Sequence, residues 1–118
     1  MAYLNAEIET VEIDFPLNIV WKTIKKAVSR FEWTIEMADE STCRMQAKTK
    51  EVCFLSCATV LSIEAKVVSE KVSRVTVRAE TPVTTITSIN FGKTQAYINS
   101  FLEALSIEIP KNTKVDII

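Results

Sequence analysis

The sequence contains no histidine, and Gly92 is its only glycine where an average composition would give about eight. Without histidine there is no Ser-His-Asp or Cys-His nucleophile pair and no His-ligated metal. Without glycine-rich turns there is no Walker A phosphate cradle and no G-x-G-x-x-G dinucleotide turn, because both need backbone conformations that favour glycine. The sequence therefore predicts a non-catalytic domain without a cofactor.

The three cysteines, Cys43, Cys53 and Cys57, are an odd number and lack C-x-x-C spacing. This pattern fits neither a disulfide framework nor a zinc knuckle. We expect reduced, buried thiols and no metal site. The alternatives are a three-cysteine metal site completed by a carboxylate and a redox role for Cys53 and Cys57.

Charges of the two signs nearly cancel, since 14 basic and 15 acidic residues give a formal net charge of −1. There is no global field that would attract nucleic acid or an anionic membrane, so any such binding would have to be local. Residues 1–6 lack the basic start of a secretory signal, and no apolar run approaches the roughly 20 residues of a membrane span. We expect a cytoplasmic protein.

Hydrophobic periodicity predicts an α+β two-layer sandwich with the order β-α-β-β-β-β-α. Its antiparallel β-meander carries both helices packed on one face. Residues 1–118 are expected to form one domain, in which 107–118 are an edge strand or a frayed tail.

The first strand is expected over 6–14, with a β-bulge at Glu9-Thr10 where the apolar positions change from even to odd. A helix follows from Pro16 to about Arg30, with Asp14 as a possible cap. Its polar face carries four basic residues: Lys22, Lys25, Lys26 and Arg30. This basic face is either solvated or a contact for phosphate or lipid headgroups.

Two hairpins follow, each with an expected register. Trp33 pairs with Ala47 and Ile35 with Met45, which places Glu36 opposite Arg44. In the second hairpin, Val67 pairs with Val75, which places Glu64 opposite Arg78. The polar face of the sheet is therefore expected to meet water or a polar partner.

The segment Val52–Val60 between the hairpins carries apolar residues at positions that should point outward: Val52, Phe54, Ala58 and Val60. Something is expected to cover them. The leading functional hypothesis is an interaction domain that self-associates through this segment as a dimer. The alternatives are that the segment bends around the core, or that the tail or a ligand covers it.

The second helix is expected to begin after Asn90 and to bury Tyr97, Ile98, Phe101, Leu102 and Leu105. Residues 107–110 are a candidate edge strand. The start of this helix, Asn90-Phe91-Gly92-Lys93-Thr94, could hold an anion, but the interpretation that we prefer is a simple cap at Asn90 with a tight turn at Gly92.

Two parts of the sequence resemble known families. Ile13-Asp14-Phe15-Pro16 followed by Val20-Trp21 resembles the opening of START/Bet v1-like helix-grip proteins, which implies an apolar ligand cavity between a sheet and a C-terminal helix. Phe91-Gly92 and the closing helix are similar to small uncharacterised bacterial β-α-β4-α domains, which implies a fold and no known activity. The second functional hypothesis is therefore a carrier of a small apolar ligand held between sheet and helices, lined by Trp21, Trp33, Met37, Met45, Phe101 and Leu102.

Overall fold

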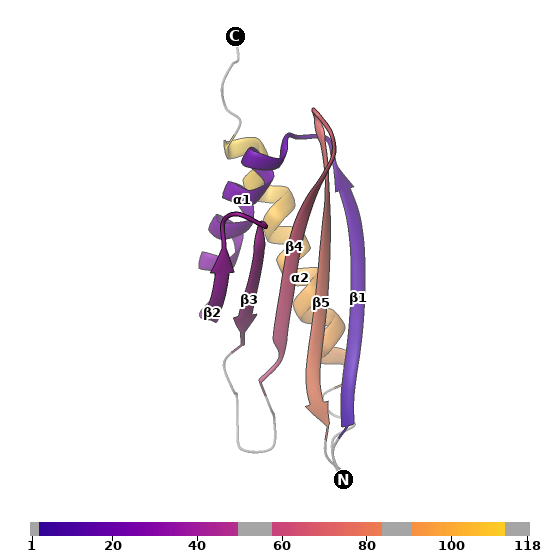
Figure 1. Ribbon diagram of the computed structural model, residues 1–118. Coiled ribbons are helices and arrows are strands. Elements are labelled where there is room, and N and C mark those ends of the chain that lie inside the picture. The colour runs from indigo at the N-terminus through magenta and orange to yellow at the C-terminus, as the bar shows by residue number, and fades with distance from the viewer. Residues whose placement is uncertain (1–2, 50–57, 84–90, 113–118) are drawn as a thin grey trace.

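The computed structural model describes residues 3–49, 58–83 and 91–112 (Figure 1). The elements are β1 (Tyr3–Ile13), α1 (Leu17–Ser29), β2 (Thr34–Asp39), β3 (Arg44–Lys48), β4 (Val60–Ser69), β5 (Val72–Val83) and α2 (Phe91–Asn112). This order confirms the predicted β-α-β-β-β-β-α arrangement.

The described strands form one antiparallel sheet in the order β1-β5-β4-β3-β2. Strands β2 to β5 are a meander, whereas β1 pairs with the last strand, so that α1 carries the chain from one edge of the sheet to the other. Both helices lie on the same face of the sheet (Figure 1). The fold is therefore the predicted two-layer α+β sandwich, with β1 and β2 as its edges.

The core lies between the sheet and the helices. Residues of β3, β4 and β5 alternate between the core and the outer face, as the period of a strand requires. From the helix layer, α1 buries Val20, Ile24 and Val28, while α2 buries Ile98, Phe101 and Leu105. Burial of each such large side chain contributes about 1.5–3 kcal/mol, so this interface holds the layers together.

The bulge predicted in β1 is wrong, because β1 pairs with β5 without interruption from Tyr3↔Val83 to Ile13↔Ser73. Ile8 consequently lies on the outer face, opposite Arg78, and is 58% exposed. Glu7 and Glu9 lie opposite core residues of β5, on the helix-facing side. Charged side chains on this side of an edge strand are tolerated where the helices leave them exposed to solvent. They also disfavour pairing of the edge with another strand.

The predicted register of the first hairpin is also wrong. Ile35 pairs with Ala47 and Met37 with Gln46, with a bulge between the two pairs, and Trp33 precedes β2. Arg44 therefore lies opposite Asp39 instead of Glu36. In the turn, Cys43 has a φ of 53°, so the turn and the bulge together move the pairing.

The second hairpin is tighter than predicted. Val67 pairs with Ser73 instead of Val75, and Glu64 pairs with Thr76 instead of Arg78. The last pair, Ser69↔Val72, leaves a shorter turn than expected, and the register shifts between Val67 and Ser69. The position of the turn thus changes the partner of every residue along the hairpin.

The helix ends differ from expectation in two places. At the start of α1, Pro16 has an extended backbone, and its carbonyl accepts hydrogen bonds from the amides of Ile19 and Val20. No side chain caps this helix, so the cap expected at Asp14 is absent. The edge strand predicted over 107–110 is wrong, because α2 continues through Asn112 and buries Ile109.

Within the described ranges, neither helix is both long and apolar enough to cross a membrane.

Candidate functional site: an apolar groove between β1 and α2

An apolar groove of about 440 Å³ lies between the C-terminal half of β1 and the C-terminal half of α2. Its residues come from these two elements and from the link after β1: Val11, Glu12, Ile13, Phe15, Leu102, Leu105, Ser106 and Ile109. The volume lies within the range of roughly 300–1,000 Å³ that is usual for small-molecule sites. The groove is large enough to hold a small ligand.

Two sequence periods build the groove. Val11 and Ile13 are two residues apart in a strand, so both side chains face the helix layer. Leu102, Leu105 and Ile109 follow steps of three and four residues, so they share one face of α2. Because β1 is an edge strand, no further strand closes the side of the groove among the described residues.

The wall of the groove beyond β1 is tied to the sheet by a hydrogen bond. The buried Ser73 hydroxyl on β5 donates to the backbone carbonyl of Phe15 at 2.8 Å. The Phe15 amide in turn donates to the carbonyl of Ile13 at 2.8 Å. These bonds fix the link between β1 and α1, and thereby the place of Phe15 in the wall.

Of the six residues predicted to line a ligand site, only Leu102 lies in this groove. Met45 and Phe101 are fully buried in the core, and Met37 lies exposed on β2, opposite Gln46 of the outer face. Trp33 is half-buried and stacks on Phe31 with ring centroids 4.3 Å apart. Five of the six, all but Met37, therefore lie in or against the hydrophobic core between the sheet and the helices instead of together around this groove. The pairing of Met37 with Gln46 places Met37 on the outer face.

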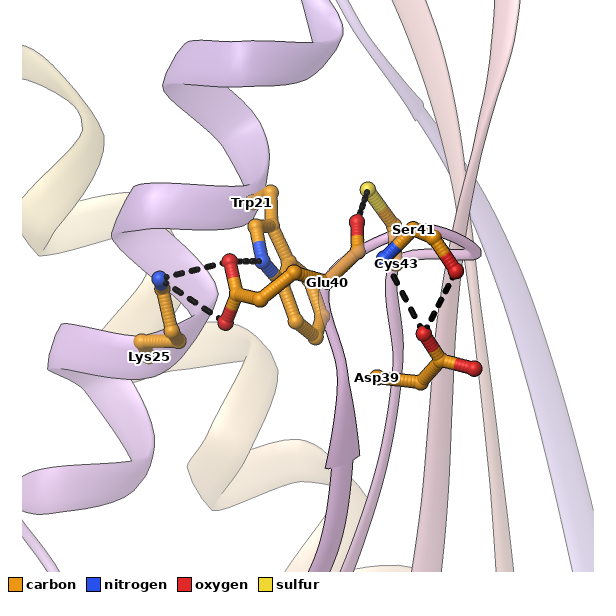
Figure 2. A network of polar contacts seen from close by, with 6 residues as sticks. All are labelled: Trp21, Lys25, Asp39, Glu40, Ser41 and Cys43. Carbon is orange, nitrogen blue, oxygen red and sulfur yellow. Dashed lines mark hydrogen bonds and ion pairs between the residues drawn. The ribbon is translucent and has the colours of Figure 1, made fainter.

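The remaining predicted liner, Trp21, belongs to a polar cluster at the turn between β2 and β3 (Figure 2). Its indole Nε1 donates to Glu40 Oε1 at 2.8 Å, and Lys25 Nζ lies 3.1 Å from the same oxygen. The hydrogen bond from Trp21, followed by that from Lys25, lowers the pKa of Glu40. This cluster fastens the turn to α1.

Beside this cluster, the half-buried Cys43 directs its Sγ toward the carbonyl of Glu40 at 3.7 Å. Burial, and then the negative charge of Glu40, raise the pKa of this thiol. The thiol is therefore held in its neutral, less reactive form. Cys53 and Cys57 lie outside the described residues, and among those described no group of His, Cys, Asp and Glu could hold a metal ion.

The predicted basic face of α1 is divided by ion pairs. Lys25 is bound to Glu40, and Arg30 Nη1 lies 3.3 Å from Glu108 Oε2 on α2. Lys22 and Lys26 are exposed on the same helix. Two of the four cations are thus paired with carboxylates of the β2–β3 turn and of α2.

The predicted interface segment is only partly described. Val52 and Phe54 lie outside the described residues, Ala58 is buried within the chain and Val60 is half-buried. At the start of α2, Asn90 also lies outside them, and the buried Thr94 hydroxyl lies 2.7 Å from that of Thr81. Ala58 and Thr94 are therefore engaged inside the fold, so they are not free to meet a second chain or an anion.

The apolar residues of each of the two groove walls could be recognised in the sequence, but the contact between the two walls could not. The odd-numbered apolar residues of β1 and the apolar spacing of α2 were visible in it. What it did not show is that α2 extends through Ile109, or that this part of the helix lies along β1. The signal that could have found the site is the helical spacing of Leu102, Leu105 and Ile109, which runs through the segment expected to be a strand.

A sheet whose first and last strands pair, covered by a long C-terminal helix, defines a helix-grip fold. A point mutant of norcoclaurine synthase from Thalictrum flavum, solved with a transition-state analogue, matches with a TM-score of 0.74 at 10% identity, over 97% of this chain and 99% of that one. An uncharacterised protein from Bacillus thuringiensis matches with a TM-score of 0.66 at 14% identity, over 88% and 98% of the two chains. Ara h 8.0201 matches with a TM-score of 0.67 at 8% identity, over 92% and 99%.

These neighbours are Bet v1-like and START-like proteins and an uncharacterised bacterial protein, so both predicted resemblances are confirmed at the level of the fold. At such low identity the likeness shows the fold alone. No protein-family model and no curated protein matches the chain.

Proposed function

We propose that the chain binds a small apolar ligand in the groove between β1 and α2. The observation that carries this proposal is the groove itself, whose walls combine Val11, Ile13 and Phe15 with Leu102, Leu105 and Ile109. Transfer of apolar ligand surface from water into such a groove is favourable by about 25 cal/mol per Å². Ser106 and Glu12 supply the polar groups at its border.

Two neighbours of the same fold support the proposal. One norcoclaurine synthase structure holds a transition-state analogue, and another holds dopamine and hydroxybenzaldehyde. Dopamine and hydroxybenzaldehyde are small molecules that each carry an apolar aromatic ring. For the present chain, the same fold together with an apolar groove favours binding of a ligand of similar size, and no reaction follows from it.

The test fills the groove from one side. Leu102→Trp places an indole into it, whereas Ile107→Trp, on the same helix but outside the groove lining, is the matched control. Binding is measured by the fluorescence of anilinonaphthalene sulfonate and by its displacement with decanoate. We expect Leu102→Trp to weaken binding about tenfold or more, because the indole takes the place of part of the ligand in the groove. The lost burial of that apolar part of the ligand is worth at least about 1.4 kcal/mol.

The control variant should bind like the unmodified chain. Equal binding by both variants and the unmodified chain would contradict the proposal, provided that urea unfolding shows both variants to be folded. Native mass spectrometry of the chain purified from its own host gives an independent answer. A monomer with added mass supports the carrier, whereas a bare dimer favours the alternative of self-association.

A further inference from the structure

The end of β4, next to its turn into β5, presents two adjacent exposed valines. Val67 is 61% exposed and Val68 is 43% exposed, although valine is among the residues most often buried. The last pair between β3 and β4 is Arg44↔Glu64, so beyond Glu64 the strand β4 is paired with β5 alone. The end of the hairpin, residues 66–74, therefore projects past the meander and is called the hairpin tip below.

The charge of the hairpin tip is predominantly positive. It carries Lys66, Lys71 and Arg74 against Glu70, three cations and one anion, which gives a net charge of +2. Lys66 and Arg74 also lie 3.9 and 2.8 Å from carboxylates of Glu64 and Glu12, respectively. Because all these groups are at least one-third exposed, such pairs are weak and leave the cations available to an anionic surface.

The hairpin tip lies beside the apolar groove. Ile13 of the groove pairs with Ser73, and Ser73 pairs with Val67, so one row of residues crosses from the groove wall to the tip. The Ser73 hydroxyl also holds the carbonyl of Phe15 in the groove wall. Figure 1 places the tip at the same end of the molecule as the last residues of β1 and the last turns of α2.

We propose that the hairpin tip docks on a bilayer surface that contains anionic lipid. Val67 and Val68 enter the boundary between headgroups and acyl chains, while the cations of the tip face the lipid phosphates. Two valines and a small positive charge give weak, reversible binding, which suits a protein that visits a membrane. Docking in this orientation brings the groove to the bilayer, and, on the basis of the proposed function, an apolar ligand from the lipid would enter it there.

The test is sedimentation with phosphatidylcholine vesicles, with and without a third of phosphatidylglycerol. We expect binding to the anionic vesicles that decreases with salt. Val67→Ser combined with Val68→Ser should reduce it about tenfold or more, and Lys71→Glu should reduce it severalfold. Ile8→Ser is the matched control, because Ile8 is as exposed as Val67 but lies on the outer face, several residues along the sheet from the tip.

The proposal is overturned by no binding of the unmodified chain to anionic vesicles, by an equal loss in the control, or by unchanged binding in the double variant. Concentration-dependent association of the chain that the double variant abolishes would instead assign the tip to a second copy, and would also overturn it. Binding of anilinonaphthalene sulfonate in solution is measured in parallel. If the double variant still binds anilinonaphthalene sulfonate but not the vesicles, docking by the tip fails or succeeds without any consequence for the groove proposal. If the unmodified chain does not bind anilinonaphthalene sulfonate, that result counts against the groove proposal alone.

Discussion

The indole Nε1 of Trp21 donates a hydrogen bond of 2.8 Å to Glu40 Oε1, and this bond joins α1 to the turn between β2 and β3 (Figure 2). Lys25 adds two hydrogen bonds to the same carboxylate, at 3.1 and 3.2 Å, and lies over the Trp21 ring. In the described sheet, β2 pairs with β3 alone. The Trp21–Glu40 bond therefore anchors the more exposed edge of the sheet to the helix layer.

The first prediction concerns the pH dependence of this anchor. The folded state lowers the pKa of Glu40 below its ordinary value of 4.5, first through Trp21 and then through Lys25. Its contribution to stability is therefore fully present above pH 4.5 and is lost as the pH falls through the lowered pKa. Glu40→Gln should lower the urea midpoint near neutral pH, and the difference from the unmodified chain should shrink in acid.

The measurement is urea unfolding followed by Trp fluorescence, from about pH 7 to about pH 3. Glu36→Gln, at an exposed position on β2, is the control and should leave the midpoint nearly unchanged. A difference between Glu40→Gln and the unmodified chain that persists at the acid end would contradict the assigned role of the carboxylate.

The second prediction concerns a buried chain of threonine hydroxyls. Thr81 Oγ1 lies 2.7 Å from Thr59 Oγ1 and 2.7 Å from Thr94 Oγ1, so that it connects β5 to the residue that precedes β4 and to α2. Thr81→Val keeps the side-chain shape but removes a partner from two buried hydroxyls. We expect unfolding to become easier by about 1–3 kcal/mol, the usual cost of a buried polar group without its partner.

Thr76→Val provides the comparison, because Thr76 lies 3.3 Å from Thr10 in an exposed threonine pair. Water replaces the lost partner there, so the change should stay within about 0.5 kcal/mol. Chemical denaturation measures both. Equal losses in the two variants would show that the buried chain has no special role.

Element order and helix α1 could be predicted because they depend on local periodicity. The apolar stripe of α1 needs only residues three and four apart, and Val20, Ile24 and Val28 are indeed buried. Alternation likewise located β3, β4 and β5. These patterns report which face of an element is apolar, and burial follows directly from that.

Register and the groove could not be predicted in this way. The turn of each hairpin sets the pairs, and a bulge near Glu36 or at Val68 moves them without a distinctive residue type. Ile8 is apolar but faces outward, because β1 keeps one register along its length. The groove depends on contact between β1 and the far end of α2, for which no local pattern exists.

The third prediction tests the end of α2, where the sequence suggested a strand. Residues two apart share a face in a strand, but they point in different directions in a helix. Ile109 is 5% exposed whereas Ile107 is 44% exposed, as the helix requires. We therefore expect Ile109→Ala to destabilise the fold by about 2 kcal/mol or more, since it leaves a cavity against Leu105 and β1.

Ile107→Ala should change stability by less than about 1 kcal/mol, because its side chain is half in water and alanine favours the helix. The two variants differ in position alone, so the comparison cancels the chemistry of the substitution. Thermal and urea unfolding measure both. Losses of the same size would place the two side chains on one face, and would overturn both the continued helix and the groove wall that Ile109 forms.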